Sequence, residues 1–281
     1  MNAHPSGDVS SFIVHRSSLL VMGILNVTPD SFSDGGVHFD RDKAIDAALR
    51  MERDGASIID VGGESTRPGS SEVALDQELE RVVPVIEGIR KRSDVRISID
   101  TRKARVAAAA LDAGADIVND VSALRHDAEM RPLVAKRRVP VILMHMRGEP
   151  RTMQENPQYD DVVRDVAREL ATWRDEAVAA GVEPANVLID PGIGFGKTLE
   201  HNLELLAHCD ELTRIAPVVI GASRKGFIGH LTGQAGGAPR VAGSLATVAA
   251  AHRGGAAIVR VHDVRETVDF LRVLSSIEAR R

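Results

Sequence analysis

Residues 96–120 read RISIDTRKARVAAAALDAGADIVND and contain an apolar run, an alanine-rich stretch and a second apolar run. The runs RISID and ADIVND are short and carry isoleucine or valine, which is typical of buried strands. The stretch between them has helical composition and reaches Gly114, a residue type that commonly ends a helix. These residues therefore predict a strand–helix–strand unit, with Asp100 and Asn119 at the ends of its two strands.

The same unit recurs along the chain, because eight short apolar runs each stop on a polar residue. Between most of them lie stretches rich in Ala, Leu and charged residues with helical spacing. Alternation of this kind favours parallel strands in one sheet. The runs are LLVMGILN (19–26), SIIDVGGE (57–64), RISID (96–100), ADIVND (115–120), PVILMH (140–145), NVLID (186–190), PVVIGASRK (217–225) and AIVRVH (257–262).

Eight such units can close into a ring. The result is a (β/α)8 TIM barrel, in which all the strand ends lie on the face that carries the active site. We expect residues 19–281 to form this single α/β domain after an N-terminal tail of residues 1–18. The loops after the first two strands are long and polar, and we expect both to be mobile. A doubly wound open sheet is the alternative, although NVTPDSF (26–32) is not its glycine-rich turn.

The composition restricts both the fold and the surroundings. A length of 281 residues suits one α/β barrel, and 3% aromatic residues suit parallel strands filled by Val, Ile, Leu and Ala. The net charge of −5, with both signs interspersed, gives no indication of nucleic-acid binding. We see neither a signal-peptide core nor a membrane-spanning run, and the single cysteine, Cys209, fits a reducing compartment. We therefore expect a soluble cytoplasmic protein.

Two predictions concern individual helices. The first helix should begin near Arg41 and stop at Gly55. The second contains DQELERVVPVIEGIRKR (76–92), in which Pro84 predicts a kink or a break because proline lacks an amide hydrogen.

Three polar residues at strand ends suggest a pocket for a flat ring. Asp100, Asn119 and Asp190 would lie near one another, with carboxylates that accept hydrogen bonds and an amide that also donates them. They suit a heterocycle with several N–H donors and one carbonyl. Each residue could instead cap the following helix, as Asp and Asn often do. Three such residues directed to one centre favour the binding interpretation.

Positive charge gathers at the ends of strands 2, 7 and 8, on Arg67, Lys225, Arg260 and His262. Barrels often bind phosphate at the loops after strands 7 and 8, and Arg and Lys suit phosphate oxygens. The alternative is a set of solvated surface side chains. That alternative is less natural for Arg260, which lies inside the apolar run AIVRVH.

Nucleotide and metal motifs are weak. The segment IDPGIGFGKTLEHN (189–202) contains Gly-Lys-Thr like a P-loop, but three residues separate Gly192 from Gly196 where that motif needs four. The histidines form no zinc-hydrolase pattern, and His145 alone is better interpreted as a packed core residue. Asn26 could give one oxygen to a Mg²⁺ ion whose other ligands come from substrate phosphate and water.

A resemblance to a known family runs from about residue 20 to the C-terminus. Its segments are GILNVTPDSFSDGG (23–36), DVGGESTRPG (60–69), SIDT (98–101), NDVS (119–122), ILMHMRGEPRTMQENPQYDDV (142–162), IDPGIGFGKTLEHNLELL (189–206), GASRKGFIG (221–229), GSLAT (243–247) and RVHDV (260–264). In this order they resemble dihydropteroate synthase, a transferase of folate biosynthesis. The resemblance implies a homodimeric barrel that uses Mg²⁺, joins 6-hydroxymethyl-7,8-dihydropterin diphosphate to p-aminobenzoate, and is a target of sulfonamides. The expected partners are these small-molecule substrates, with no nucleic acid and no membrane.

The resemblance also implies roles for individual residues. Asp100, Asn119, Asp190 and Lys225 look like the pterin pocket, with Met144, Phe195 and Gly221 as further substrate-binding residues. Asn26, Arg67, Arg260 and His262 look like the diphosphate and Mg²⁺ site, with Asn26 as the metal ligand. Thr66, Arg67 and Pro68, with Phe32 and Asp34, resemble mobile lids that complete the p-aminobenzoate site, and Ser223 is placed to receive the carboxylate of that substrate. The residues expected to be catalytic are Asp34, Arg67, Asp100 and Lys225.

Two other functions remain as alternatives. A pterin-binding methyltransferase barrel, which serves a corrinoid protein, would share a pocket like the Asn119 and Asp190 region but needs no diphosphate clamp. A degenerate paralogue with a binding or structural role would have lost charged groups. The STRPG loop and the SRK and RVH strand endings argue against the first, and the intact motifs argue against the second.

Overall fold

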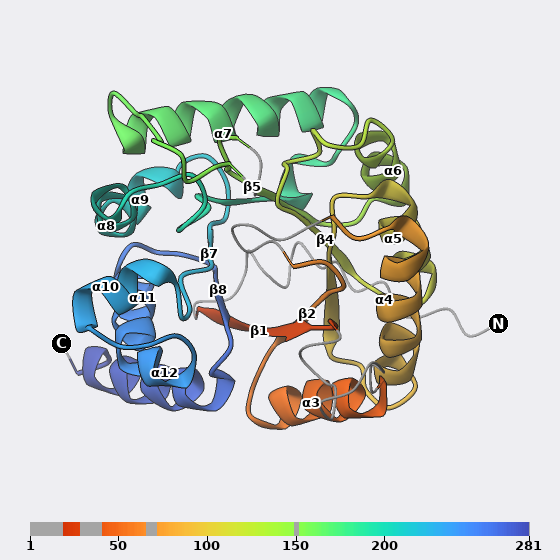
Figure 1. Cartoon of the computed structure of the whole chain (residues 1–281), viewed down its shortest axis with the longest axis horizontal. Coiled ribbons are helices and arrows are strands. Elements are labelled where there is room, and N and C mark those ends of the chain that lie inside the picture. Colours follow the sequence, from red (N-terminus) through yellow and green to blue (C-terminus); the bar gives the residue numbers. More distant parts are fainter. Residues whose placement is uncertain (1–18, 29–40, 66–71, 149–151, 281) are drawn as a thin grey trace.

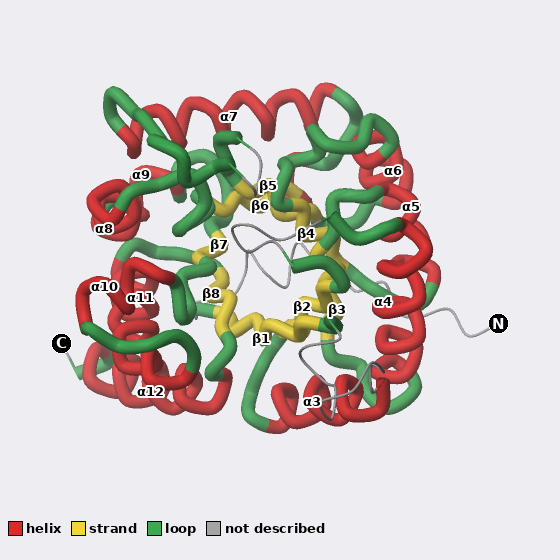
Figure 2. The backbone as a smooth tube through the Cα atoms, in the orientation of Figure 1, coloured by secondary structure: helices red, strands yellow, loops and turns green. Residues whose placement is uncertain are grey.

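Eight parallel strands form a closed barrel in a computed structural model that describes residues 19–28, 41–65, 72–148 and 152–280. The strand order is β6-β5-β4-β3-β2-β1-β8-β7, and a parallel bridge between Ile189 and Val218 joins the two edge strands. Helices surround the ring of strands (Figures 1 and 2). The predicted (β/α)8 barrel is confirmed, and the open-sheet alternative is wrong. The predicted tail, residues 1–18, lies outside the described residues, as does most of the loop after the first strand.

The strands lie where the apolar runs predict them. They are β1 Leu20–Asn26, β2 Ile58–Gly62, β3 Arg96–Asp100, β4 Ile117–Asp120, β5 Val141–Met144, β6 Val187–Asp190, β7 Val219–Ile220 and β8 Ile258–Val261. The helices are α3 Arg41–Arg53, α4 Leu75–Arg90, α5 Ala104–Asp112, α6 Met130–Arg137, α7 Val162–Ala179, α8 Leu199–Ala207, α9 Cys209–Leu212, α10 Gly226–Thr232, α11 Val241–Arg253 and α12 Val264–Glu278. None of these helices is long and apolar enough to cross a membrane.

The two helix predictions have different outcomes. Helix α3 begins at Arg41, and Gly55 follows its end with a φ of +104°, as a helix-stopping glycine does. The predicted break at Pro84 is wrong, because α4 runs without interruption from Leu75 to Arg90. The buried face of α4, which includes Val82, Val85 and Ile86, packs in the main core. This packing holds the helix together despite the missing amide hydrogen.

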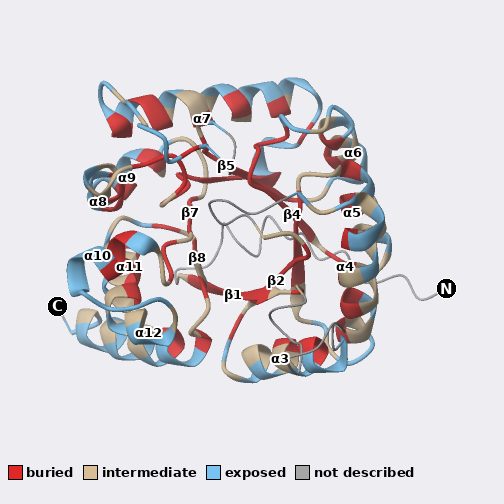
Figure 3. Cartoon of the chain, viewed as in Figure 1, coloured by how far each residue is buried: buried red, intermediate tan, exposed pale blue. Residues whose placement is uncertain are grey.

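Every strand except β3 separates two apolar clusters, because successive side chains point to opposite faces. Val21, Ile59, Val118, Ile189 and Val259 belong to the large cluster that also contains the buried helix residues. Their strand neighbours form a separate small cluster that fills the barrel interior and that we call the apolar floor. It consists of Leu20, Met22, Ile58, Ile117, Ile142, Leu188, Val219 and Ile258. Figure 3 shows the resulting pattern, with buried strands and helices exposed only on their outer sides.

Candidate active site

The barrel interior changes from apolar to polar within two residues. The side chains two positions beyond the apolar floor keep its inward direction, since the strand period is two. These positions include Asp60, Asn119, Asp190 and Arg260, and Asp100 is paired in register with Asn119. We call these five residues the polar layer. It brings together Asp100, Asn119 and Asp190, the three residues that the sequence predicts at one centre.

Arg260 connects two carboxylates in the polar layer. Its Nε donates to Asp60 Oδ2 at 2.6 Å, and a terminal nitrogen donates to Asp100 Oδ2 at 2.7 Å. Although burial acts to lower the pKa of Arg260, the Asp60 and Asp100 carboxylates raise it above its ordinary value. Arg260 is therefore an inward, permanently charged residue, and the surface alternative for it is wrong.

Asp60 is a residue of this site to which the sequence analysis gave no role. It is fully buried, and its Oδ2 also accepts from Asn119 Nδ2 at 3.2 Å. Its other oxygen, Oδ1, is buried without a hydrogen-bond partner among the described residues. Asp60 thus fixes both Asn119 and Arg260. Its signal in the sequence is its position two residues after Ile58, the same spacing that separates Asn119 from Ile117.

Burial changes the protonation of the carboxyl groups. Burial raises the pKa of Asp100 to about 7, against the lowering effect of Arg260. Burial also raises the pKa of Asp190, although the Gly192 amide donates to Asp190 Oδ1 at 2.7 Å. Groups with such shifted pKa values cluster at functional sites more often than elsewhere.

Lys225 follows β7, the strand next to that of Arg260, and its charge acts on Asp190. Its charge acts to lower the pKa of Asp190, and its Nζ lies 3.9 Å from the centroid of the Phe195 ring. At Gly221 a Cβ atom would lie 3.5 Å from Asp190 Oδ2 and 3.9 Å from the Arg260 Cβ. The predicted residues Gly221 and Lys225 therefore lie near Asp190, and Phe195 lies beside Lys225.

An apolar wall stands next to these charges. Met144 is paired in register with Asp190 on the neighbouring strand. It belongs to a small buried cluster with Phe195, Val121, Met146 and Met153. The wall offers a flat ring an apolar surface beside the hydrogen-bonding groups, a combination common in ligand sites.

Ser223 and His262 lie together at the ends of strands β7 and β8. The Ser223 hydroxyl is 3.1 Å from His262 Nδ1 and accepts from the His262 amide at 3.2 Å. Helix α10 begins at Gly226, three residues after Ser223. The neighbouring residue Arg224 pairs with Asp263.

Asn26 ends β1 and is paired in register with Gly62 of β2. Within the described part of the chain, no three His, Cys, Asp or Glu residues are grouped to hold a metal ion. An ion bound at Asn26 would need most of its ligands from substrate and water, which Mg²⁺ accepts readily. The donor set therefore fits the predicted role of Asn26 in a substrate-borne Mg²⁺ site.

Five predicted site residues fall outside the described residues: Phe32, Asp34, Thr66, Arg67 and Pro68. The segment before residues 66–71 ends in a polar cluster that the sequence analysis did not predict. Lys103 donates to Glu78 at 2.6 Å and pairs with Glu64, which also accepts from the Val73 amide at 3.2 Å. Glu64 and Val73 stand on either side of residues 66–71, so this cluster connects the two ends of that segment.

Comparisons with known proteins agree with this geometry. A family model described as pterin binding enzyme matches residues 22–262. The dihydropteroate synthase of Escherichia coli strain K12 is 48% identical over 257 residues, which cover 91% of this chain and 90% of that protein. The Synechocystis dihydropteroate synthase is 46% identical over 258 residues, covering 92% and 89%.

Solved structures give the same result. The Xanthomonas albilineans dihydropteroate synthase with 4-aminobenzoic acid superposes with a TM-score of 0.88 at 47% identity, covering 94% of each chain. The same enzyme in complex with 7,8-dihydropteroate gives a TM-score of 0.85 at 44% identity, covering 94% of this chain and 95% of that one. Both the sequence and the three-dimensional match extend over nearly the whole chain. The chain therefore belongs to the dihydropteroate synthase family of pterin-binding enzymes.

Proposed function

We propose that the chain condenses 6-hydroxymethyl-7,8-dihydropterin diphosphate with p-aminobenzoate to give 7,8-dihydropteroate and diphosphate. The observation that carries the proposal is the polar layer above the apolar floor, with Arg260 and Lys225 beside its carboxylates. The polar layer offers acceptors for the N–H groups of a pterin, and the cations suit a diphosphate. A synthase needs both features, whereas the methyltransferase alternative needs only the first.

In this proposal the pterin ring lies on the polar layer. Asp100, Asn119 and Asp190 accept hydrogen bonds from its ring and amino N–H groups, and Lys225 donates to its carbonyl oxygen. Met144 and Phe195 cover the apolar face of the ring. Asp60 keeps Asn119 and Arg260 in place through the two hydrogen bonds at its Oδ2. These fixed groups lose little further freedom when the substrate binds.

The reaction breaks the C–O bond between the pterin methylene and the diphosphate and forms a C–N bond to p-aminobenzoate. Arg260 and His262 neutralise charge on the departing diphosphate. The nearby carboxylates stabilise positive charge on the methylene as the leaving group departs. The arylamine is already nucleophilic and loses one proton after attack, so no strong base is required. Ser223, beside His262, accommodates the carboxylate end of p-aminobenzoate.

A Mg²⁺ ion belongs to this proposal, with Asn26 as its protein ligand. When bound, it supplies charge neutralisation for the diphosphate leaving group. The location of the chain in the cytoplasm, expected from the sequence, stays a prediction.

The test of the proposed function is diphosphate release by the purified chain with dihydropterin diphosphate and Mg²⁺, with and without p-aminobenzoate. We expect release that depends on p-aminobenzoate and an equal amount of dihydropteroate. Tight pterin binding without condensation would contradict the synthase proposal and favour the methyltransferase or paralogue alternatives.

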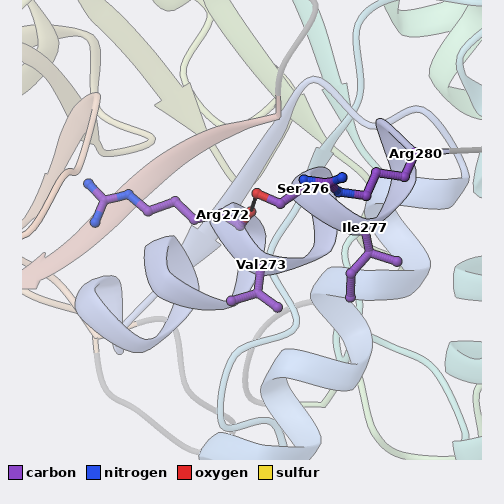
Figure 4. Close-up of a pocket in the computed structure, with 5 residues that line it drawn as sticks. All are labelled: Arg272, Val273, Ser276, Ile277 and Arg280. Carbon is purple, nitrogen blue, oxygen red and sulfur yellow. Dashed lines mark hydrogen bonds between the residues drawn. The ribbon is translucent and has the colours of Figure 1, made fainter.

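We also propose that the chain is a homodimer, and that α12 contributes to its contact. Val273 and Ile277 are one turn apart on α12 and are 62% and 54% exposed, although both are large and apolar. With Arg272, Ser276 and Arg280 they line a shallow groove (Figure 4). An exposed apolar strip framed by basic residues is typical of a protein contact surface.

The double substitution Val273→Glu and Ile277→Glu should convert the dimer to a monomer, because four carboxylates would meet in the contact. Sedimentation velocity measures the change. Leu203→Glu is the matched control, since Leu203 is a 41% exposed apolar residue on α8. A wild-type chain that sediments as a monomer, or a double variant that remains dimeric, would contradict the role given to α12.

A further inference from the structure

Lys197, the lysine of the Gly-Lys-Thr sequence, is directed into the protein. The residue is 3% exposed. Its Nζ donates to the Phe195 carbonyl oxygen at 2.9 Å and lies 3.1 Å from His145 Nδ1 and 3.4 Å from the His145 carbonyl oxygen. Burial lowers the pKa of Lys197 to about 7, and in its ammonium form the three acceptors use all three hydrogens. Lys197 therefore has no hydrogen left for a substrate phosphate, unlike the lysine of a P-loop.

His145 extends this network to helix α7. Because Lys197 donates to Nδ1, the ring carries its own proton on Nε2, which donates to Glu169 at 3.0 Å. Glu169 also pairs with Arg147, and the Trp173 ring stacks on His145 with centroids 5.4 Å apart. Burial lowers the pKa of His145 to about 4, so the ring is neutral near pH 7, as this arrangement requires.

The loop between β6 and α8 is shaped to place Lys197 there. Gly192 and Gly196 have φ angles of +66° and +59°, in the left-handed region that favours glycine. A Cβ atom on Gly192 would lie 1.9 Å from the His145 carbonyl oxygen, so the two backbones approach too closely for any other residue. Thr198 then caps α8 by accepting from the His201 amide.

The same loop carries Phe195, whose ring supports Lys225. The hydrogen bond from Lys197 fixes the Phe195 backbone, and the Phe195 ring lies 3.9 Å from Lys225 Nζ. A cation over an aromatic face is attracted to it, so the ring helps to hold the ammonium group. A chain of contacts thus leads from Lys197 through Phe195 to Lys225, beside Asp190.

We propose that Lys197 is a positioning residue for the pterin substrate, which acts by fixing Phe195 and through it Lys225. Lys197 itself contacts no substrate. The inference rests on the proposed function, because Lys225 must bind the pterin for its position to matter. It also gives the lysine of the Gly-Lys-Thr sequence a role other than that in a phosphate cradle.

The test is Lys197→Met, which keeps an unbranched side chain one atom shorter and removes its donors. We expect the KM for dihydropterin diphosphate to rise about tenfold, as for a lost hydrogen bond to a charged group. The KM for p-aminobenzoate should change less than about twofold, because Ser223, the described residue predicted to bind it, contacts His262 through the hydrogen bonds described above. Thr198→Ala is the control in the same loop: it removes the cap of α8 and lowers Tm but leaves both KM values unchanged.

A double-mutant cycle separates positioning from general destabilisation. In a Phe195→Leu background, Lys197→Met should add no more than about a twofold further change in the pterin KM, since both act on Lys225. Three results would overturn the inference: effects of the two substitutions on the pterin KM that multiply in the double variant, an equal rise in both KM values, or an unchanged pterin KM. If Lys197→Met does not fold, Lys197→Gln retains one donor group and is measured in the same cycle. A wild-type chain without condensation activity would instead refute the proposed function.

Discussion

The apolar floor and the polar layer lie two residues apart along the strands, and they have opposite effects on the stability of the barrel. The floor removes eight apolar side chains from water and stabilises the barrel. The polar layer buries three carboxylates with one arginine between two of them, an arrangement that opposes folding unless every charge is compensated. The floor residues therefore stabilise the barrel, and the last residues of the strands form the candidate site.

The largest effect on folding should come from the floor. Ile142→Ala leaves a cavity among fully buried side chains, so the free energy of unfolding should fall by about 2–5 kcal/mol. Urea unfolding measures this loss, and Leu203→Ala at the surface should change it by less than about 0.5 kcal/mol. Both substrate KM values should stay close to those of the wild type. A tenfold higher KM for the pterin substrate, with an unchanged free energy of unfolding, would show that the floor and the polar layer do not act separately.

The polar layer should respond in the opposite way. Asp190→Asn should lower kcat/KM by about 100-fold or more, equal to about 2.7 kcal/mol of lost transition-state stabilisation. Its free energy of unfolding at pH 7 should not fall, because burial raises the pKa of Asp190 and the fold opposes its charge. Turnover and urea unfolding of the same preparation check both parts. Asp210→Asn, on the exposed surface of α9, serves as the control, and unchanged turnover in Asp190→Asn would remove that residue from the site.

The last expected effect is a pH dependence that belongs to the polar layer alone. The pKa of Asp100 is raised in the fold from 3.8 to about 7, so the folded state holds more protons between these values. Its contribution to stability is therefore complete below pH 3.8 and is lost as the pH rises through 7. The stability of the wild type relative to Asp100→Asn should decline over that range, as measured by urea unfolding at several pH values. A difference that stays constant with pH would mean that Arg260 keeps Asp100 ionised throughout.

Much of the fold could be predicted because its signals are local. Apolar runs and the glycines after helices locate the strands and the end of α3, and parallel strands necessarily bring their ends together. The same local signals predict that Asp100, Asn119 and Asp190 lie near one another. The break that Pro84 predicts as one outcome does not occur, since local helix rules do not include the packing of Val82 and Val85 in the core.

The remainder of the site depends on contacts between distant residues. The spacing from Ile58 indicates that Asp60 points inward, but its hydrogen bond to Arg260 joins residues that are 200 positions apart in the sequence. Lys197, His145 and Glu169 likewise come from three separate segments. The sequence predicts His145 as a packed core residue, and it is fully buried, but no local pattern reveals its partners.

The closure of the barrel completes the polar layer, because its cations lie in the last segments of the barrel. Strands β1 to β6 each pair with their sequence neighbours, whereas β1 also pairs with β8, and β7 contacts β6 through a single bridge. Arg260 and Lys225 arrive with these last segments. While the chain is being synthesised, the first six strands can assemble as each emerges. At that stage the carboxylates of Asp60, Asp100 and Asp190 still lack the neighbouring charges of Arg260 and Lys225. The position of Arg260 in the polar layer therefore depends on the pairing of β8 with β1.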